Sequence, residues 1–246
     1  MTQDRTNDAP ATFRRRIIIN ADDLGASHGI NRGIAESHMR GAVTSASLMV
    51  NMPATDAAIL MVRELRTLSV GLHVNFTNEG GEPIVDLDDT NGCRQELLAQ
   101  YESFRSLAGR EPTHLDSQHH IHTRSNLAPV FEDLARTVGL PLRGSPPVNY
   151  VGSFYGQWDG QTHIEQLTVE SLTNIIISES KGEITEFGCH PGYIDDAFKT
   201  VYNHEREVEL TTLCDPSLRG AIGAARLDLI GFGELLFHPT SPEVRG

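Results

Sequence analysis

The sequence predicts an α/β protein in which about seven parallel strands close into a barrel. Apolar segments and amphipathic segments alternate about seven times along the 246 residues, the pattern expected of repeated βαβ units. Reactive polar residues follow or end several of the apolar segments, and a barrel gathers its site at the carboxyl ends of its strands. An open, doubly wound sheet is the alternative. Such a sheet usually carries a Gly-x-Gly-x-x-Gly turn after its first strand, and that turn is absent here.

Three apolar segments in the first half of the chain predict strands, at residues 16–20, 45–50 and 69–75. The first contains three consecutive isoleucines, which is typical of a strand buried on both faces. Apolar residues at helical spacing predict the intervening helices, at about 29–40, 53–66 and 94–108. Residues 77–92 are rich in Gly, Asp and Asn, which predicts a long loop beside a site.

The second half continues this alternation. Further strands are expected over the histidine-rich segment after Pro112 and at residues 140–143, 183–189 and 227–230. Further helices are expected at about 126–138, 164–177, 204–213 and 217–225. Residues 144–160 carry Gly, Pro and aromatic residues, and predict an irregular loop that either covers the domain or lines a sugar site. The patternless residues 1–13 predict a flexible tail, and 14–246 a single domain.

Composition argues against several classes of partner. The formal net charge of −13 argues against nucleic acid and against anionic membrane surfaces. No apolar run approaches the roughly 20 residues of a membrane span, and the N-terminus has no hydrophobic signal core. Cys93, Cys189 and Cys214 form no paired zinc motif, so we expect free thiols in a reducing cytoplasm.

A dense cluster of titratable residues follows Pro112. Its members are His114, Asp116, His119, His120 and His122. On a strand, alternation places His114, Asp116 and Gln118 on one face, and His120 keeps that parity if the extended geometry continues. Imidazoles beside a carboxylate suit a divalent metal or proton transfer. The alternative is a polar surface segment.

Four further candidates end or follow other predicted strands: Asp22, Asp23, His73 and His190. Asp22 and Asp23 come after the first strand, His73 lies near the end of the third, and His190 follows the strand at 183–189. In a parallel barrel these positions meet at one face, so we expect a shared site there.

Four ordered motifs resemble those of one enzyme family. They are Asn20-Ala21-Asp22-Asp23-Leu24-Gly25, Gly71-Leu72-His73, Pro112-Thr113-His114-Leu115-Asp116-Ser117 and Cys189-His190-Pro191-Gly192. Together with Thr44-Ser45 and Phe154-Tyr155-Gly156, they are similar to the YdjC family of carbohydrate deacetylases, the ChbG/HpnK-like enzymes, over about residues 16–229. The resemblance implies a distorted (β/α) barrel and metal-dependent removal of an acetyl group from an N-acetylated amino sugar.

The resemblance also implies metal ligands at Asp23 and His73. The family's third ligand is usually a histidine at the position that Gln118 occupies here. A Gln carbonyl binds zinc-like metals less well than imidazole does, but it suits harder cations. Gln118, His119 or His120 could complete the set. We favour His120 because it shares the strand parity of Gln118, whereas His119 would need a backbone kink.

The remaining roles follow from the chemistry of amide hydrolysis. Asp22, adjacent to the first ligand, is expected to be the general base. His190 is expected to protonate the leaving amine, a role that rests partly on similarity to the wider polysaccharide deacetylases. Asp116 is expected to orient an imidazole, Arg143 to steady a carboxylate and Tyr155 to contact substrate. The alternatives are a helix-capping Asp22, a structural buried His190 and an ordinary surface Arg143.

We therefore expect one divalent metal ion, Mg or Zn, an amino-sugar substrate and a homodimer. One rival is a metal-dependent phosphoesterase, which would need several metals and more basic residues than 20 Lys and Arg against 33 acids provide. A rival of another class is a non-catalytic sugar-binding protein that has lost the metal through Gln118. Counting bound metal per chain separates the three: one, several or none.

Overall fold

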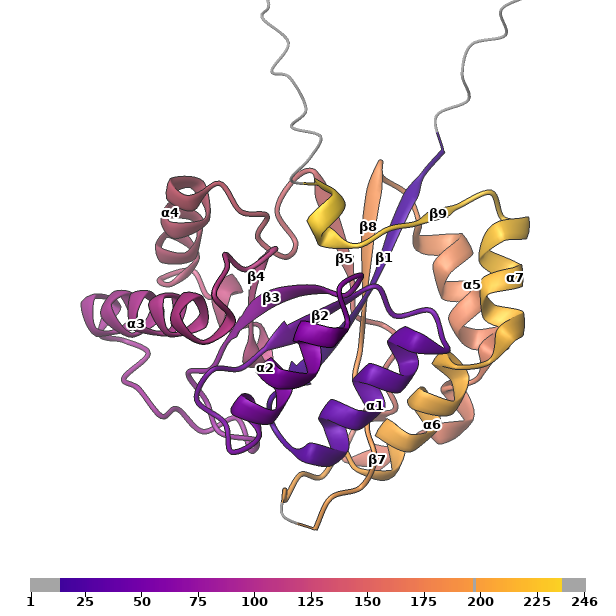
Figure 1. The fold of residues 1–246 in the computed structure, drawn as a ribbon, viewed down its shortest axis with the longest axis horizontal. Helices are drawn as coiled ribbons and strands as arrows, with labels where there is room; N and C mark the ends of the chain where they lie inside the picture. Colours follow the sequence, from indigo (N-terminus) through magenta and orange to yellow (C-terminus); the bar gives the residue numbers. More distant parts are fainter. Residues whose placement is uncertain (1–13, 197, 236–246) are drawn as a thin grey trace, which may run out of the picture.

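Seven strands form one parallel sheet that curves into an incomplete barrel (Figure 1). The computed structural model describes residues 14–196 and 198–235, so the tail expected at 1–13 lies outside the described residues. The strands follow the order β4-β3-β2-β1-β8-β5, and β9 pairs with β1. Their bounds are β1 Arg16–Leu24, β2 Ser45–Leu48, β3 Ser69–Val74, β4 Leu115–Ser117, β5 Val148–Val151, β8 Ile184–Cys189 and β9 Asp228–Leu229.

The barrel stays open between its two outer strands. Within the described residues, β4 and β5 end the strand order and do not pair with each other. Leu142 narrows the gap, because it forms a parallel bridge to Leu115 of β4. The expected distorted barrel of about seven parallel strands is thus confirmed, in the form of a half-barrel with flanking helices.

Helices connect the strands and cover the outside of the sheet. Their bounds are α1 His28–Met39, α2 Thr55–Glu64, α3 Thr90–Ala108, α4 Ala128–Val138, α5 Val169–Glu179, α6 His204–Leu213 and α7 Pro216–Ala224. In Figure 1, α3 and α4 lie beside β3 and β4, and α5 and α7 lie together at the opposite side of the sheet. None of the described helices is both long and apolar enough to cross a bilayer.

Three shorter 3₁₀ segments and a small hairpin complete the described chain. They are η1 Gln118–Thr123, η2 Ile164–Gln166, η3 Phe232–Leu235, and the antiparallel pair β6 Gln157–Trp158 and β7 Gln161–Thr162. The hairpin belongs to the connection between β5 and α5, far along the chain from the histidine-rich segment.

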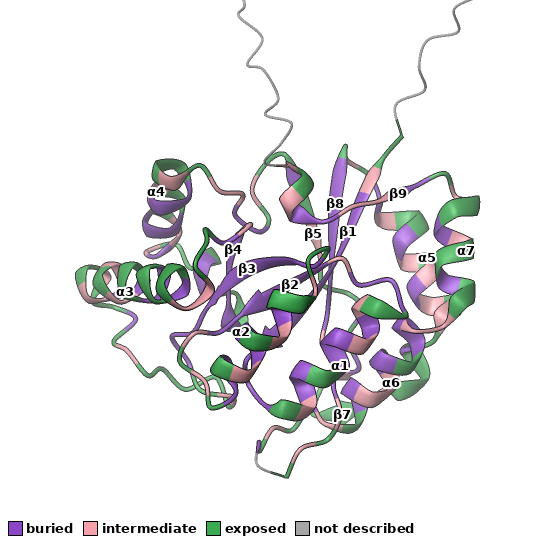
Figure 2. Cartoon of the chain, viewed as in Figure 1, coloured by how far each residue is buried: buried purple, intermediate pink, exposed green. Residues whose placement is uncertain are grey.

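The consecutive isoleucines of β1 are buried on both faces, as their sequence predicts. Ile17 and Ile19 belong to the large core beneath the outer helices, whereas Ile18 packs with Val148 and Phe232 on the inner side. Figure 2 shows the strands as mostly buried and the outward faces of the helices as exposed. Two-sided burial explains why these parallel strands read as apolar runs and not as alternating ones.

Four expected elements differ from the observed ones. Residues 140–143 form only the isolated bridge at Leu142, and the expected loop at 144–160 instead contains β5, whose alternation is hidden among Gly and Pro neighbours. The expected helix at 164–177 begins as η2, and α5 starts only at Val169. The histidine-rich strand ends at Ser117, because the backbone turns into η1 at the next residue.

Candidate active site

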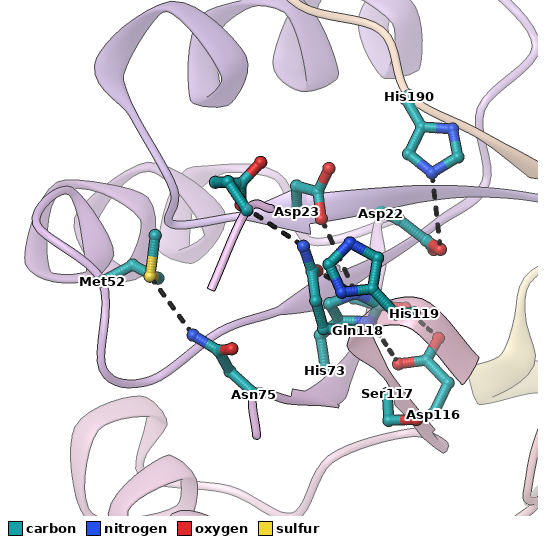
Figure 3. Close-up of polar contacts among 12 residues, drawn as sticks. Asp22, Asp23, Met52, His73, Asn75, Asp116, Ser117, Gln118, His119 and His190 are labelled. Carbon is teal, nitrogen blue, oxygen red and sulfur yellow. Dashed lines mark hydrogen bonds and ion pairs between the residues drawn. The ribbon is translucent and has the colours of Figure 1, made fainter. Parts of the chain in front are cut away.

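A pocket of about 320 Å³ opens at the carboxyl ends of the strands. Its lining includes the expected site residues Asp22, Asp23, His73, Gln118 and His190. They come from β1, from β3, from the start of η1 and from the loop after β8, so segments far apart in sequence meet at one face. Figure 3 shows the side chains converging, with His190 joined to Asp22 and His73 joined to Asp23.

A bulge in β1 lets two consecutive acids face the same pocket. In a regular strand, neighbouring side chains point to opposite faces. Here the pairing of Ala21 with Ala46 is followed by that of Leu24 with Leu48, so β1 contains one extra residue. Asp23 takes up the difference with a left-handed backbone, φ 69°. Both carboxylates therefore line the pocket.

Arg143 lies at the centre of the barrel interior, with a side chain only 1% exposed. It donates two hydrogen bonds of 2.7 Å to Asp22, one from each terminal nitrogen, and its Nε donates to Glu186 at 2.9 Å. Its Nη2 also lies 2.7 Å from Asp116. The surface-arginine alternative is therefore wrong, and Arg143 makes the contacts with carboxylates that its expected role requires.

This guanidinium controls the charge of the neighbouring acids. Burial alone would raise the pKa of Asp22, but Arg143 outweighs it and holds that pKa well below its usual range. For Asp116 the same balance gives a pKa of about 2. Glu186 is the exception, since burial outweighs its contacts with Arg143 and raises its pKa to about 7. Asp22 and Asp116 are thus ionised at neutral pH.

His73 is held between two carboxylates and an amide. Its Nδ1 is 2.8 Å from Asp116 Oδ1, while its Nε2 is 3.6 Å from Asp23 Oδ1 and 3.0 Å from Gln118 Oε1. Burial would lower the pKa of His73, but Asp116 and the two acids of β1 raise it to about 9. Without a metal ion, His73 is therefore protonated and donates from both nitrogens.

Glycine at position 71 makes room for this arrangement. A Cβ there would lie 2.4 Å from the His114 ring, which fills the barrel interior beneath the site. His114 stacks on Phe232 at 3.9 Å and contacts the Ser47 hydroxyl at 3.1 Å, and its burial lowers its pKa to about 4. His114 thus has a structural role as a neutral imidazole. The motif before His73 contains glycine at position 71 because a larger residue would clash with the His114 ring.

The expectation that the strand continues through His120 is wrong. His119 and His120 both have left-handed backbones, with φ of 50° and 54°, so strand parity ends at Ser117. His119 is turned to the Thr77 hydroxyl, 2.8 Å from its Nδ1. The His120 ring lies near the rings of His122 and Tyr150, at 5.9 and 5.2 Å. Left-handed non-glycine residues are strained and cluster at functional sites.

The remaining histidine of the cluster lies outside the pocket lining. His122 is buried and contacts the Ser117 hydroxyl at 2.6 Å, and its burial lowers its pKa to about 4. In the segment from residue 113 to 122, the side chains of Asp116 and Gln118 form hydrogen bonds with His73. The segment therefore divides into residues that build the site and residues that support it.

The donor groups in the pocket suit a metal ion. Asp22, His73 and Asp116 offer ligand atoms within 4.8 Å of one another, and together with the fold they point to a divalent metal. Both acids of this set already have partners. Both oxygens of Asp22 bind Arg143, and the oxygens of Asp116 bind Ser47 and His73. A second donor set, Asp23 Oδ1, His73 Nε2 and Gln118 Oε1, opens directly into the pocket.

Spacing supports the second set. Ligands bound at about 2.1 Å to one ion, at tetrahedral or octahedral angles, lie roughly 3.0–3.4 Å apart. The observed separations from His73 Nε2, 3.6 Å to Asp23 and 3.0 Å to Gln118, are close to this range. Asp116 binds the opposite nitrogen of His73, the arrangement that usually fixes the orientation of a metal-binding imidazole.

His190 and two tyrosines form an aromatic wall of the pocket. His190 Nε2 is 4.0 Å from Asp22 Oδ2, and burial lowers the pKa of His190 to about 4 despite the nearby acids. Tyr155 stacks on Tyr202 at 4.5 Å with nearly parallel planes, and both rings meet His190 edge-on. Tyr155 is 37% exposed, so this aromatic surface is open to a ligand.

Three residues that line or adjoin the pocket lie outside the sequence motifs. Arg206 of α6 donates to Asp23 Oδ2 at 2.6 Å. Glu79, in the loop after β3, accepts a 3.3 Å hydrogen bond from Gln118, and burial raises its pKa to about 7. Glu209 of α6 accepts from the backbone N–H of His190. The loop at 77–92 is expected beside a site, but no motif singles out Glu79 within it. The helix α6 reads as an ordinary polar helix, and only tertiary folding turns Arg206 and Glu209 inward.

Comparisons with known proteins agree with this geometry. Residues 16–224 match the family described as YdjC-like protein. A carbohydrate deacetylase of Geobacillus stearothermophilus is 36% identical over 250 residues, covering 89% of this chain and 98% of that protein. A carbohydrate deacetylase of Vibrio vulnificus (strain CMCP6) is 29% identical over 256 residues, covering 91% of this chain and 98% of that protein.

Solved structures share the fold. A protein of Enterococcus faecalis V583, described as a cellobiose-phosphate cleavage protein, matches with a TM-score of 0.75 and 27% identity over 90% of this chain and 99% of that chain. The chitin deacetylase of Colletotrichum lindemuthianum matches with a TM-score of 0.55 and 12% identity, over 91% of this chain and 88% of that chain.

Proposed function

Since the chain belongs to the YdjC-like family, we propose that it is a carbohydrate deacetylase that removes the acetyl group of an N-acetylated amino sugar. The sugar is free or part of an oligosaccharide or glycoconjugate. The observation that carries this proposal is the content of one pocket. It holds an ionised Asp22 beside His190 together with three converging donors, Asp23, His73 and Gln118.

The proposed metal site consists of Asp23, His73 and Gln118. This assignment replaces His120 with Gln118, because the amide oxygen is 3.0 Å from His73 Nε2 and the strand parity that favoured His120 is absent. A bound divalent cation would polarise the amide carbonyl and acidify a water molecule. Two oxygen donors and one imidazole are compatible with Mg or Zn, and the Gln carbonyl favours the harder of the two.

Asp22 is the proposed general base. Arg143 binds both of its oxygens, so the carboxylate is ionised and its orientation is fixed. Because its pKa is held low, Asp22 accepts a proton only from an acidified water and does not keep it. The helix-capping alternative is not supported, since α1 is capped by Ser27 and Asp22 faces the pocket.

His190 is the proposed donor of a proton to the leaving amine. Its pKa of about 4 makes the resting imidazole neutral, so it must first receive a proton. Asp22 lies 4.0 Å away and can pass on the proton that it takes from water. The leaving amine is far more basic than either group. The proton therefore ends on the amine nitrogen as the C–N bond breaks, and the acetyl carbon receives the water oxygen.

The aromatic wall suits a sugar ring. Tyr155 offers an exposed face beside His190, and stacking of an aromatic ring on the apolar face of a sugar would orient the acetamido group toward Asp22. The three cysteines are free, as expected. We further propose a homodimer in the cytoplasm, with neither nucleic acid nor membrane as a partner, in keeping with the net charge of −13.

Acetate release from a panel of N-acetylated amino sugars and their oligomers tests the proposal. We expect release with at least one member, loss of release after exhaustive chelation, and recovery after a divalent metal is returned. Full activity in a metal-free preparation would overturn the mechanism. A phosphoesterase would instead release phosphate from sugar phosphates and bind several metal ions per chain, and a non-catalytic sugar-binding protein would bind sugar without product.

A further inference from the structure

The two ends of the Gln118 amide face different partners. Its carbonyl oxygen lies 3.0 Å from His73 Nε2, on the side of the proposed metal. Its amide nitrogen donates a 3.3 Å hydrogen bond to Oε1 of Glu79. An amide can turn over and present its nitrogen to the metal side, where it could bind no cation. An ionised carboxylate accepts hydrogen bonds and cannot donate them, so ionised Glu79 stabilises only the orientation in which the oxygen faces His73.

The hydrogen bond between Gln118 and Glu79 resembles the one between His73 and Asp116. Asp116 accepts a hydrogen bond from the far nitrogen of His73 and so points Nε2 at the pocket. Glu79 accepts one from the far end of Gln118 in the same way. A hydrogen bond from the amide NH₂ to a carboxylate also shifts electron density toward the carbonyl oxygen, which makes the oxygen a better ligand.

The loop after β3 also contacts the imidazole of His119, the residue next to Gln118. Thr77 contacts His119 Nδ1 at 2.8 Å, two residues before Glu79 contacts Gln118. One short loop segment thus holds His119 by its side chain while it orients the amide next to it. Glu79 itself is only partly exposed and also bonds to the Thr200 hydroxyl, so its carboxylate is held in place.

We propose that Glu79 is a positioning residue that makes Gln118 an effective metal ligand in place of an imidazole. The inference rests on the proposed metal site and deepens it. Glu79 acts through Gln118 and is not itself a ligand of the ion. Its effect therefore depends on the Gln118 side chain, and this dependence can be measured without any substrate.

A double-mutant cycle on metal affinity tests the proposal. Zn²⁺ and Co²⁺ are titrated calorimetrically into the metal-free parent, Glu79→Ala, Gln118→Ala and the double variant. Glu79→Ala is expected to lower affinity about 10–100-fold, the usual cost of losing a group that orients a ligand. In the Gln118→Ala background the same change should have no further effect. Glu82→Gln, which removes a charge from the same loop, is the control and should bind like the parent.

Each outcome has a separate meaning. Parent-like affinity in Glu79→Ala overturns the inference and leaves the proposed function intact. An equal loss in the presence and absence of Gln118 also overturns it, because Glu79 would then act as a direct ligand or through its charge alone. Circular dichroism checks that every variant is folded. If the folded parent binds neither ion, the proposed metal site fails and the inference fails with it.

Discussion

Asp22 and Asp23 are neighbours of identical chemistry whose surroundings differ. Asp22 has both oxygens bound to Arg143 and lies on the His190 side of the pocket. Asp23 has one oxygen toward His73 and the other toward Arg206. Asp22 is ionised and fixed, but both of its oxygens are bound to Arg143. Asp23 keeps one oxygen directed at the proposed metal. Two different roles for the pair follow from these contacts.

Asp22→Asn is expected to lower acetate release by about 10²–10⁴-fold, the usual contribution of a general base, with metal content unchanged. The amide keeps the shape of the carboxylate but cannot accept the water proton. Asp23→Asn is the matched comparison and should lose metal. Rates and metal content of both variants decide the matter. Metal lost from Asp22→Asn and retained by Asp23→Asn would mean that the roles are reversed.

Gln118→Ala is expected to weaken metal binding more than His120→Ala does. The Gln118 oxygen is 3.0 Å from His73 Nε2, whereas the His120 ring lies against His122 and Tyr150. Loss of one of three protein ligands should lower affinity by more than the roughly 10–100-fold typical of an orienting partner. Metal titration of both variants is the measurement. A large loss in His120→Ala with none in Gln118→Ala would restore His120 as the third ligand.

At the scale of elements, α6 supports the site through its buried residue Glu209. Glu209 of this helix is fully buried and accepts hydrogen bonds from the His190 backbone N–H at 2.6 Å and from the Tyr202 hydroxyl at 2.5 Å. One carboxylate thus joins the loop after β8 to the aromatic wall. Burial raises the pKa of Glu209 to about 7, so this link changes its charge near neutral pH.

Glu209 makes a defined contribution to the dependence of stability on pH. Its pKa is 4.5 when unperturbed and about 7 in the folded protein, so between these values the folded state binds more protons. The free energy of unfolding therefore decreases as pH rises through this window, by an amount on the order of 2 kcal/mol from this group. Glu209→Gln, which resembles the protonated acid, should lose this decrease.

Urea unfolding of the metal-free parent and Glu209→Gln at several pH values between 5 and 7.5 is the measurement. Other buried groups titrate in both proteins, so the difference between the two curves isolates Glu209. Glu207→Gln, a change on the same helix at a partly exposed position, should follow the parent. Parallel curves for parent and Glu209→Gln would show that Glu209 is already ionised at pH 5.

At the scale of the whole molecule, the site joins several strands of the sheet. Its proposed ligands come from β1, β3 and the start of η1, and Arg143 joins β1 to β8 through Asp22 and Glu186. The barrel remains open between β4 and β5, and none of the proposed ligands comes from β5. A metal ion that binds only the folded arrangement would join β1, β3 and the start of η1 at their carboxyl ends, on one side of this opening.

Metal binding is therefore expected to raise the melting temperature of the whole protein. An ion present at 100 times its dissociation constant stabilises the folded state by about 2.7 kcal/mol, or roughly 5–10 °C for a chain of this size. Thermal unfolding with and without metal measures the shift, and chelator should reverse it. Asp23→Asn should show no shift. An equal rise in that variant would mean that the ion binds elsewhere.

The sequence by itself determined the fold class, the order of most elements and the strand ends that meet at the pocket. These follow from local properties: apolar runs predict buried strands, helical spacing predicts the covering helices, and parallel topology brings strand ends such as those near Asp22, His73 and His190 to one face. The motifs carry the rest, because each places a reactive residue at the carboxyl end of a strand or directly after it.

Only the tertiary structure decided how these residues divide their tasks. Strand parity could not foresee that left-handed residues at His119 and His120 end β4, nor that an extra residue in β1 turns both acids inward. Glu79 and Arg206 reach the pocket from a polar loop and a largely polar helix, in which no motif marks them as inward-facing. Backbone irregularities and long-range contacts depend on the packing of the whole chain, and therefore no local pattern records them.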